Sequence, residues 1–146
     1  MGGDSLRFED KSTAWGLSVP SYSNGAVYAD LDNDGDLDLV VNNIDDEAFV
    51  YRNSQEKANN SFLRISLHGQ KGNQQGIGAK VWVWAKGQLQ YAEMSTVRGY
   101  QSSVEPFIHF GVGTNHQLDS LRVRWPNGHE QKLKNVKTNQ IGRAHV

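Results

Sequence analysis

Five aspartates within nine residues are this chain's strongest candidate for chemistry. Carboxylates packed into one short connection repel one another unless a cation lies among them. Calcium prefers about six to eight oxygen ligands, and carboxylates at alternating positions of a tight loop can supply several of them. The run reads DLDNDGDLD and contains Asp30, Asp32, Asp34, Asp36 and Asp38. Its spacing therefore predicts a calcium-binding loop.

The expected ligands of this loop are set by their positions relative to its first residue. Side-chain ligands are expected from Asp30, Asp32, Asp34 and Asp38. Asp36 would contribute its backbone carbonyl, and Gly35 permits a sharp turn with positive φ. Val41 stands where an EF-hand has its glutamate, and neither flank has a helical pattern, so the loop is not an EF-hand. The alternative is a solvated acidic turn.

The segments on both sides of the loop are typical of β-strands. Residues 25–30 and 37–42 are rich in β-branched and aromatic side chains and lack helix caps, so the loop is expected to join two strands of a hairpin. Residues 48–53 predict a further strand, and residues 6–17 predict a short strand or extended entry that ends in a turn. Together these segments predict one four-stranded unit, or most of one.

At these residues the chain also resembles a known family. The run SNGAVYADLDNDGDLDLVVNN is similar to an FG-GAP/VCBS repeat, the calcium-binding blade unit of integrin-type β-propellers. The resemblance implies that residues 1–54 form one blade. One blade cannot close a propeller, and about fifty residues bury little apolar surface. We therefore expect this blade to pack on the rest of the chain, and on further blades in a longer parent protein.

A second β module is expected after the polar run QEKANN at residues 55–60, which predicts a linker. Residues 61–140 contain about six short strands between glycine turns, a pattern typical of an antiparallel sandwich or barrel. Alternation predicts which side chains face its core. They are Leu63, Ile65, Leu67, Val81, Val83, Ala85, Leu121, Val123 and Trp125.

The order of short motifs in this module resembles the ASPIC/UnbV domain, found after FG-GAP repeats in extracellular proteins that include the cartilage acidic protein group. The motifs are LRISLHG, GIGAKV, RGYQSS, HFGVG and VRWPNG. The resemblance implies architecture more than activity, because the family has no securely established biochemical reaction. Residues 141–146 fit neither family and are expected to form a tail.

Charge and composition restrict the compartment and the partners. The net charge is −1, but residues 12–51 hold eight acidic and no basic residues, whereas residues 56–146 hold twelve basic and five acidic ones. The basic half has no RNP, KH or zinc-finger pattern, so nucleic acid is not an expected partner. No apolar run approaches the roughly 18 residues of a membrane span. The start lacks a signal peptide, so we expect export, to the cell surface, extracellular space or periplasm, by a signal in the parent protein.

Catalytic patterns are weak in this chain. It has no cysteine, its five histidines are scattered, and Glu93 and Glu105 could act as an acid/base pair only if they face each other. We therefore expect a non-catalytic, calcium-binding adhesion or binding module. The alternative is an ancillary or catalytic segment of a glycan-active enzyme.

A ligand surface is predicted on the strand at residues 79–86. If Val81, Val83 and Ala85 face the core, the opposite side must carry the neighbouring side chains. These are Lys80, Trp82, Trp84 and Lys86. Indole rings stack on sugars and ammonium groups neutralise acidic substituents, so an acidic glycan is the expected ligand. The alternative is that the blade or another protein covers this surface.

Overall fold

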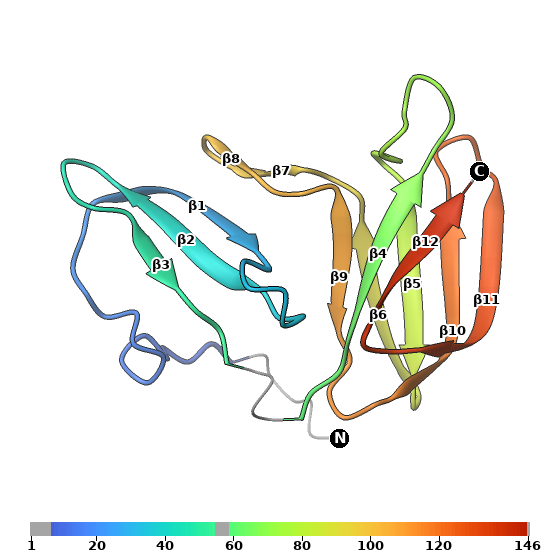
Figure 1. The fold of residues 1–146 in the computed structure, drawn as a ribbon, viewed down its shortest axis with the longest axis horizontal. Coiled ribbons are helices and arrows are strands. Elements are labelled where there is room, and N and C mark those ends of the chain that lie inside the picture. Colours follow the sequence, from blue (N-terminus) through green and yellow to red (C-terminus); the bar gives the residue numbers. More distant parts are fainter. Residues whose placement is uncertain (1–6, 55–58, 146) are drawn as a thin grey trace.

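The computed structural model describes residues 7–54 and 59–145, and within them the chain is all-β with no helix (Figure 1). The expectations that concern residues 1–6, most of the linker (55–58) and Val146 lie outside the described residues. No helix in the described part is long and apolar enough to cross a membrane. The described strands form four separate sheets, none of which closes into a barrel, and the architecture is that of an all-β sandwich with two further small sheets.

The N-terminal sheet, called the blade sheet below, has three antiparallel strands in the order β1-β2-β3. They are β1 (Ser23–Ala29), β2 (Asp38–Asn43) and β3 (Phe49–Tyr51). The expected hairpin around the aspartate loop is confirmed, since Ala29 pairs with Asp38 directly across it. Residues 12–16 form turns in which the Leu17 amide donates to the Ser12 carbonyl at 2.8 Å, and no strand precedes β1 in the described residues.

The sandwich consists of two sheets, with strand orders β11-β10-β5-β6 and β12-β4-β9. Its strands are β4 (Phe62–His68), β5 (Lys80–Ala85), β6 (Gln88–Glu93), β9 (Phe107–Gly111), β10 (Gln117–Arg124), β11 (Glu130–Lys137) and β12 (Gln140–His145). Side chains from both sheets form one buried cluster, and every core residue predicted by alternation belongs to it. The buried apolar side chains of the described residues all belong to this sandwich, so the blade sheet has no core of its own.

Strand β12 occupies the segment that the sequence analysis assigns to a tail. It pairs in parallel with β4, with Gln140 opposite Leu63 and His145 opposite His68, so the sandwich is not wholly antiparallel. The pairing is anchored where the Asn139 amide donates to the Phe62 carbonyl at 2.7 Å and Asn139 Oδ1 accepts from the Phe62 amide at 3.0 Å. The expectation of a tail is therefore wrong. Residues 140–145 have only a weak local strand pattern, and it is pairing with β4 that makes them a strand.

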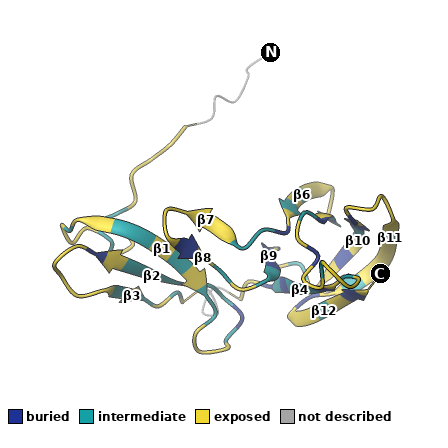
Figure 2. Ribbon diagram, turned by 90° about the horizontal axis from the view of Figure 1, so that it is seen from above, coloured by how far each residue is buried: buried dark blue, intermediate teal, exposed yellow. Residues whose placement is uncertain are grey.

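A short hairpin links the blade sheet and the sandwich. Strands β7 (Val97–Gly99) and β8 (Ser102–Ser103) lie beside β1, as both views show (Figures 1 and 2). The Ser102 hydroxyl accepts a hydrogen bond from the Ala26 amide at 3.1 Å, and Arg98 Nε donates to the Tyr28 hydroxyl at 2.6 Å. These polar contacts hold β1, and with it the start of the aspartate loop, against the second module.

Candidate metal site

The aspartate loop runs from the end of β1 to the start of β2, and its backbone conformation depends on one glycine. Gly35 has a φ of +93°, as the sequence predicts for a sharp turn at this position. A Cβ atom here would also overlap the ring of Phe62, at the start of β4. The loop therefore packs directly on the sandwich, and a side chain at residue 35 would both strain the turn and separate the two surfaces.

Three of the five predicted ligands form a compact group. Asp30, Asp32 and Asp34 each present a carboxylate oxygen, and these oxygens lie within 4.8 Å of one another. Alternating positions in the loop turn these side chains toward a common point, which is the geometry expected of the start of a calcium loop. Three carboxylates at this separation are a group that could hold a metal ion.

Asp30 is the buried member of this group. Its side chain is only 7% exposed, and the Arg64 guanidinium lies beside it, with Nη1 3.6 Å from Asp30 Oδ2. The other oxygen, Oδ1, is buried and has no hydrogen-bond partner in the described part of the chain. Burying an anionic oxygen without a partner costs several kcal/mol or more. A cation bound by Asp30 Oδ1 would remove that cost.

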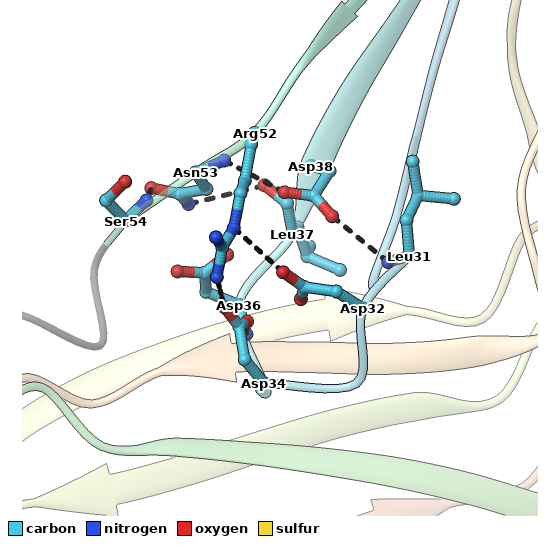
Figure 3. Close-up of polar contacts among 9 residues, drawn as sticks. All are labelled: Leu31, Asp32, Asp34, Asp36, Leu37, Asp38, Arg52, Asn53 and Ser54. Carbon is cyan, nitrogen blue, oxygen red and sulfur yellow. Dashed lines mark hydrogen bonds and ion pairs between the residues drawn. The ribbon is translucent and has the colours of Figure 1, made fainter.

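Asp38 has a different environment from the other aspartates. It is 3% exposed and lies outside the group of three. Its Oδ2 accepts from the Leu31 amide at 3.1 Å and its Oδ1 from the Asn53 amide at 2.8 Å (Figure 3). Asp38 thus ties the first residues of the loop to the chain after β3. Because each carboxylate oxygen has a further lone pair, these bonds leave it able to contact a cation as well.

Asp36 orders the loop through its backbone. Its amide donates to Asp34 Oδ1 at 3.1 Å, and its side chain is not a member of the carboxylate group. This hydrogen bond is the main influence that lowers the pKa of the Asp34 carboxyl, with the Arg52 side chain adding to it. Asp34 therefore remains a carboxylate well below neutral pH, as a metal ligand must.

Arg52 is a basic residue at this loop whose position there was not predicted from the sequence. Its Nε lies 2.8 Å from Asp32 Oδ2 and its Nη2 3.4 Å from Asp34 Oδ2, so the guanidinium lies against both carboxylates (Figure 3). Arg52 follows β3, and its side chain is 64% exposed. The only sequence signal for this role is the position of Arg52 just after β3, beside the acidic loop in a hairpin-linked sheet.

Arg64 connects the aspartate loop with the sandwich, and the sequence analysis did not predict this role. It lies on β4, where its side chain contacts Asp30 and Glu105 and packs over the Phe107 ring at 4.0 Å. Only 12% of the side chain is exposed. Neighbouring His109 pairs with Arg64 across the sheet and stacks on Phe62 at 5.6 Å between ring centroids. The junction between the modules is thus a partly buried polar network around Asp30.

Glu93 and Glu105, the predicted acid/base pair, take part in separate ion pairs. Glu105 pairs with Arg64 beside the aspartate loop, whereas Glu93 on β6 lies 3.9 Å from Lys80 and accepts from the Tyr91 hydroxyl at 3.2 Å. Each carboxylate therefore has a different cation as its partner.

The predicted ligand surface on β5 has the expected orientation. Val81, Val83 and Ala85 are buried, while Trp82 and Trp84 emerge half-buried on the other side of the sheet. Lys80 and Lys86 are exposed, Lys80 in its ion pair with Glu93 and Lys86 in the turn that follows β5. None of these residues belongs to the aspartate loop.

Comparison with known proteins identifies the class of the second module. Residues 69–144 match the sequence model of the family described as ASPIC and UnbV, which is more than half of the 146 residues. The chain therefore belongs to the ASPIC and UnbV family. The match reaches Ala144 in β12, which agrees with the place of this strand in the sandwich.

Three curated relatives extend the similarity beyond this module. The chain is 32% identical to cartilage acidic protein 1 of Homo sapiens over 130 residues, 86% of this chain and 19% of the relative. The protein of the same name from Mus musculus is also 32% identical over 130 residues, and that from Xenopus tropicalis is 32% identical over 108 residues, 71% of this chain. The chain spans about a fifth of the length of the relatives it matches.

Proposed function

We propose that the loop from Asp30 to Asp38 binds a calcium ion. The observation that carries this proposal is the Asp30 carboxylate, which has one buried oxygen, Oδ1, without a hydrogen-bond partner among the described residues and forms a compact group with the carboxylates of Asp32 and Asp34. These three side chains would contribute the first oxygens, and the Asp36 carbonyl and the Asp38 carboxylate would complete the set. An all-oxygen, carboxylate-rich site favours a hard cation such as calcium over zinc or copper.

The fold supports a structural role for this metal. The blade sheet has no buried apolar core, and large apolar side chains such as Val19, Ile44 and Val50 are more than half exposed. The resemblance of the loop to FG-GAP/VCBS repeats suggests that further blades of a longer parent protein cover these side chains. A cation that fixes the loop between β1 and β2 would then hold this blade on the ASPIC and UnbV domain.

At the level of the whole protein, we propose an extracellular, non-catalytic module for binding or adhesion. The name of the relatives, cartilage acidic protein, supports an extracellular location. Free calcium is plentiful outside cells, where modules with weak sites of about 10⁻⁴–10⁻³ M can be saturated. The separation of Glu93 and Glu105 into different ion pairs supports binding over acid/base catalysis.

The test is thermal unfolding of the 146-residue chain with calcium and with a chelator, together with calorimetric titration of calcium. Because the loop geometry exists only in the folded state, calcium at about 100 times its dissociation constant should stabilise the fold by about 2.7 kcal/mol. Replacing Asp32 by Asn removes one ligand charge at an exposed position and should abolish the response.

Asp45→Asn provides the matched control. Asp45 is exposed, lies in the turn after β2, and has a positive φ of 56° that asparagine tolerates. This variant loses the same charge outside the site and should respond to calcium as the unmodified chain does. Equal unfolding temperatures with calcium and with the chelator in the unmodified chain would show that the loop is only an acidic turn.

A further inference from the structure

The outer face of the four-stranded sheet is a second candidate binding site. Strand register places three rows of side chains across β6, β5, β10 and β11, on the side opposite the core. The first row is Glu93, Lys80, Arg124 and Glu130; the second is Tyr91, Trp82, Arg122 and Lys132; the third is Leu89, Trp84, Ser120 and Lys134. These twelve side chains are called the outer face below.

The charges of the first row are compensated within the row. Lys80 lies 3.9 Å from Glu93, and Arg124 lies 4.0 Å from Glu130. The cations of the other two rows, Arg122, Lys132 and Lys134, have no carboxylate partner among the described residues. The outer face therefore presents three uncompensated positive charges next to apolar side chains, although the whole chain carries a net charge of −1.

Arg122 is held in place by aromatic rings. Its guanidinium carbon lies 4.1 Å from the centre of the Trp82 ring and 5.9 Å from that of Trp84, while Tyr91 contacts Trp82 at 5.3 Å between centroids. Stacking on an indole fixes the guanidinium plane and leaves its edge as a fork of donors for an oxyanion. The buried Arg122 Nε has no hydrogen-bond partner in the described part of the chain.

This arrangement changes which residues would contact a ligand. Trp82 has Arg122 and Tyr91 against it, and Lys80 is paired with Glu93, so neither is the free group that the sequence pattern suggests. Anionic groups would instead be bound by Arg122, Lys132 and Lys134. Trp84 and the half-exposed Leu89 and Tyr91 would contact the uncharged parts of the same ligand.

We infer that the outer face binds an acidic polysaccharide, a chain of sugar rings that carry sulfate or carboxylate groups. Three cations separated by aromatic and aliphatic side chains fit a ligand whose charges are separated by uncharged rings. Nucleic acid is less suited to it, since the charge is modest and Arg122 and Tyr91 lie against Trp82 where bases would stack. The blade sheet lies beside the sandwich, to one side of β6, β10 and β11 (Figure 2), and leaves this face accessible.

This inference deepens the proposed binding function by naming a ligand class, but it does not depend on calcium. The test measures binding of the full chain to heparin and to dextran sulfate near 0.15 M salt, with uncharged dextran as the reference. We expect binding to both sulfated polymers and none to dextran, unchanged when calcium is chelated. If the chain binds heparin but not calcium, only the metal proposal is contradicted. If it binds calcium but not heparin, only the polysaccharide inference is contradicted.

Charge-matched variants locate the binding surface. The double variant Lys132→Gln with Lys134→Gln changes exposed residues and should weaken heparin binding at least tenfold. Arg122→Lys keeps the charge but loses the paired N–H donors of the guanidinium, and it should weaken heparin binding several-fold. The control combines Lys71→Gln with Arg143→Gln, two exposed cations away from the outer face, one of them on β12 of the opposite sheet, and should change binding less than twofold.

Three results would overturn the inference. They are absence of heparin binding at 0.15 M salt, an equal loss in the control variant, and tighter binding of single-stranded DNA than of heparin at equal charge concentration. Thermal unfolding of each variant checks that it is folded. The lysine pair keeps the test decisive even if Arg122→Lys disturbs the packing of the indole rings.

Discussion

Arg52 lies where a bound cation would have to compete with it. The guanidinium reduces the repulsion between Asp32 and Asp34 in the absence of metal, through contacts of 2.8 and 3.4 Å. A calcium ion that takes the carboxylate oxygens bound to Arg52 would have to displace the arginine side chain. Exposed ion pairs of this kind contribute up to about 1 kcal/mol each, and this contribution opposes metal binding.

Replacing Arg52 by Gln should therefore raise the calcium affinity by roughly three- to tenfold, since each tenfold change corresponds to about 1.4 kcal/mol. Calorimetric titration measures the affinity directly. Arg52→Lys keeps the charge and should stay close to the unmodified chain, while Arg143→Gln controls for the loss of a distant positive charge. A weaker affinity in Arg52→Gln would mean that Arg52 supports the loop instead of competing with the ion.

His109 makes the junction between the modules sensitive to pH. Burial lowers the pKa of His109 below its ordinary value of 6.5, and the Arg64 charge adds to this, while Asp30 opposes it. Its Nδ1 is buried without a hydrogen-bond partner in the described part of the chain. A histidine of depressed pKa takes up a proton more readily in the unfolded chain, so the folded state loses stability as the pH falls below about 6.5.

We expect the free energy of unfolding to decrease between pH 7 and pH 5.5, and the decrease to be smaller in His109→Phe. Phenylalanine keeps a flat ring against Phe62 but does not titrate. Denaturant unfolding at fixed calcium concentration measures the difference, with His129→Gln, an exposed histidine outside the junction, as control. An unchanged pH dependence in His109→Phe would exclude His109 as its source.

At the scale of elements, alternation in the sequence is sufficient to place the core strands. Leu63, Ile65 and Leu67 alternate with less buried residues in the sequence, and all three face the core from β4. The hairpin around the aspartate loop could also be predicted from a local pattern, because its carboxylates and glycine have a fixed spacing. In both places short-range pattern and final structure agree.

Other elements depend on partners that are distant in the sequence. Strand β12 has only a weak alternation, and its register is set by β4. The strands β7 and β8 are too short to show a pattern. Arg52 and Arg64 reach the aspartates from other strands, and the stacking of Arg122 on Trp82 follows from the pairing of β10 with β5. Apart from the position of Arg52 just after β3, these contacts have no local sequence signal.

At the scale of the whole molecule, Asp30 is shared by the two modules. Its Oδ2 lies 3.6 Å from Nη1 of Arg64 on β4, and its carboxylate is also one of the three that could hold a metal ion. Calcium and Arg64 would therefore both stabilise the same buried charge. In the calcium-free protein the Arg64 guanidinium, 3.6 Å from Asp30, compensates part of this charge.

Arg64→Gln should destabilise the calcium-free chain by about 3 kcal/mol, because it leaves the buried Asp30 carboxylate without its cation. Calcium should then stabilise this variant more than it stabilises the unmodified chain. Chemical denaturation with and without calcium measures both values. The double variant Arg64→Gln with Asp30→Asn removes the charge as well as its partner and should recover part of the loss; strictly additive effects would show that the two residues are not coupled.

The pairing of β12 with β4 has a consequence for biosynthesis. Phe62 and Asn139, which join the two strands, are 77 positions apart in the chain. While a ribosome is still adding the residues between them, β4 can pair with β9 but its other edge remains open. Open strand edges recruit other chains, and long-range parallel pairing forms slowly. The nascent sandwich therefore stays prone to aggregation until β12 has emerged from the ribosome and paired with β4.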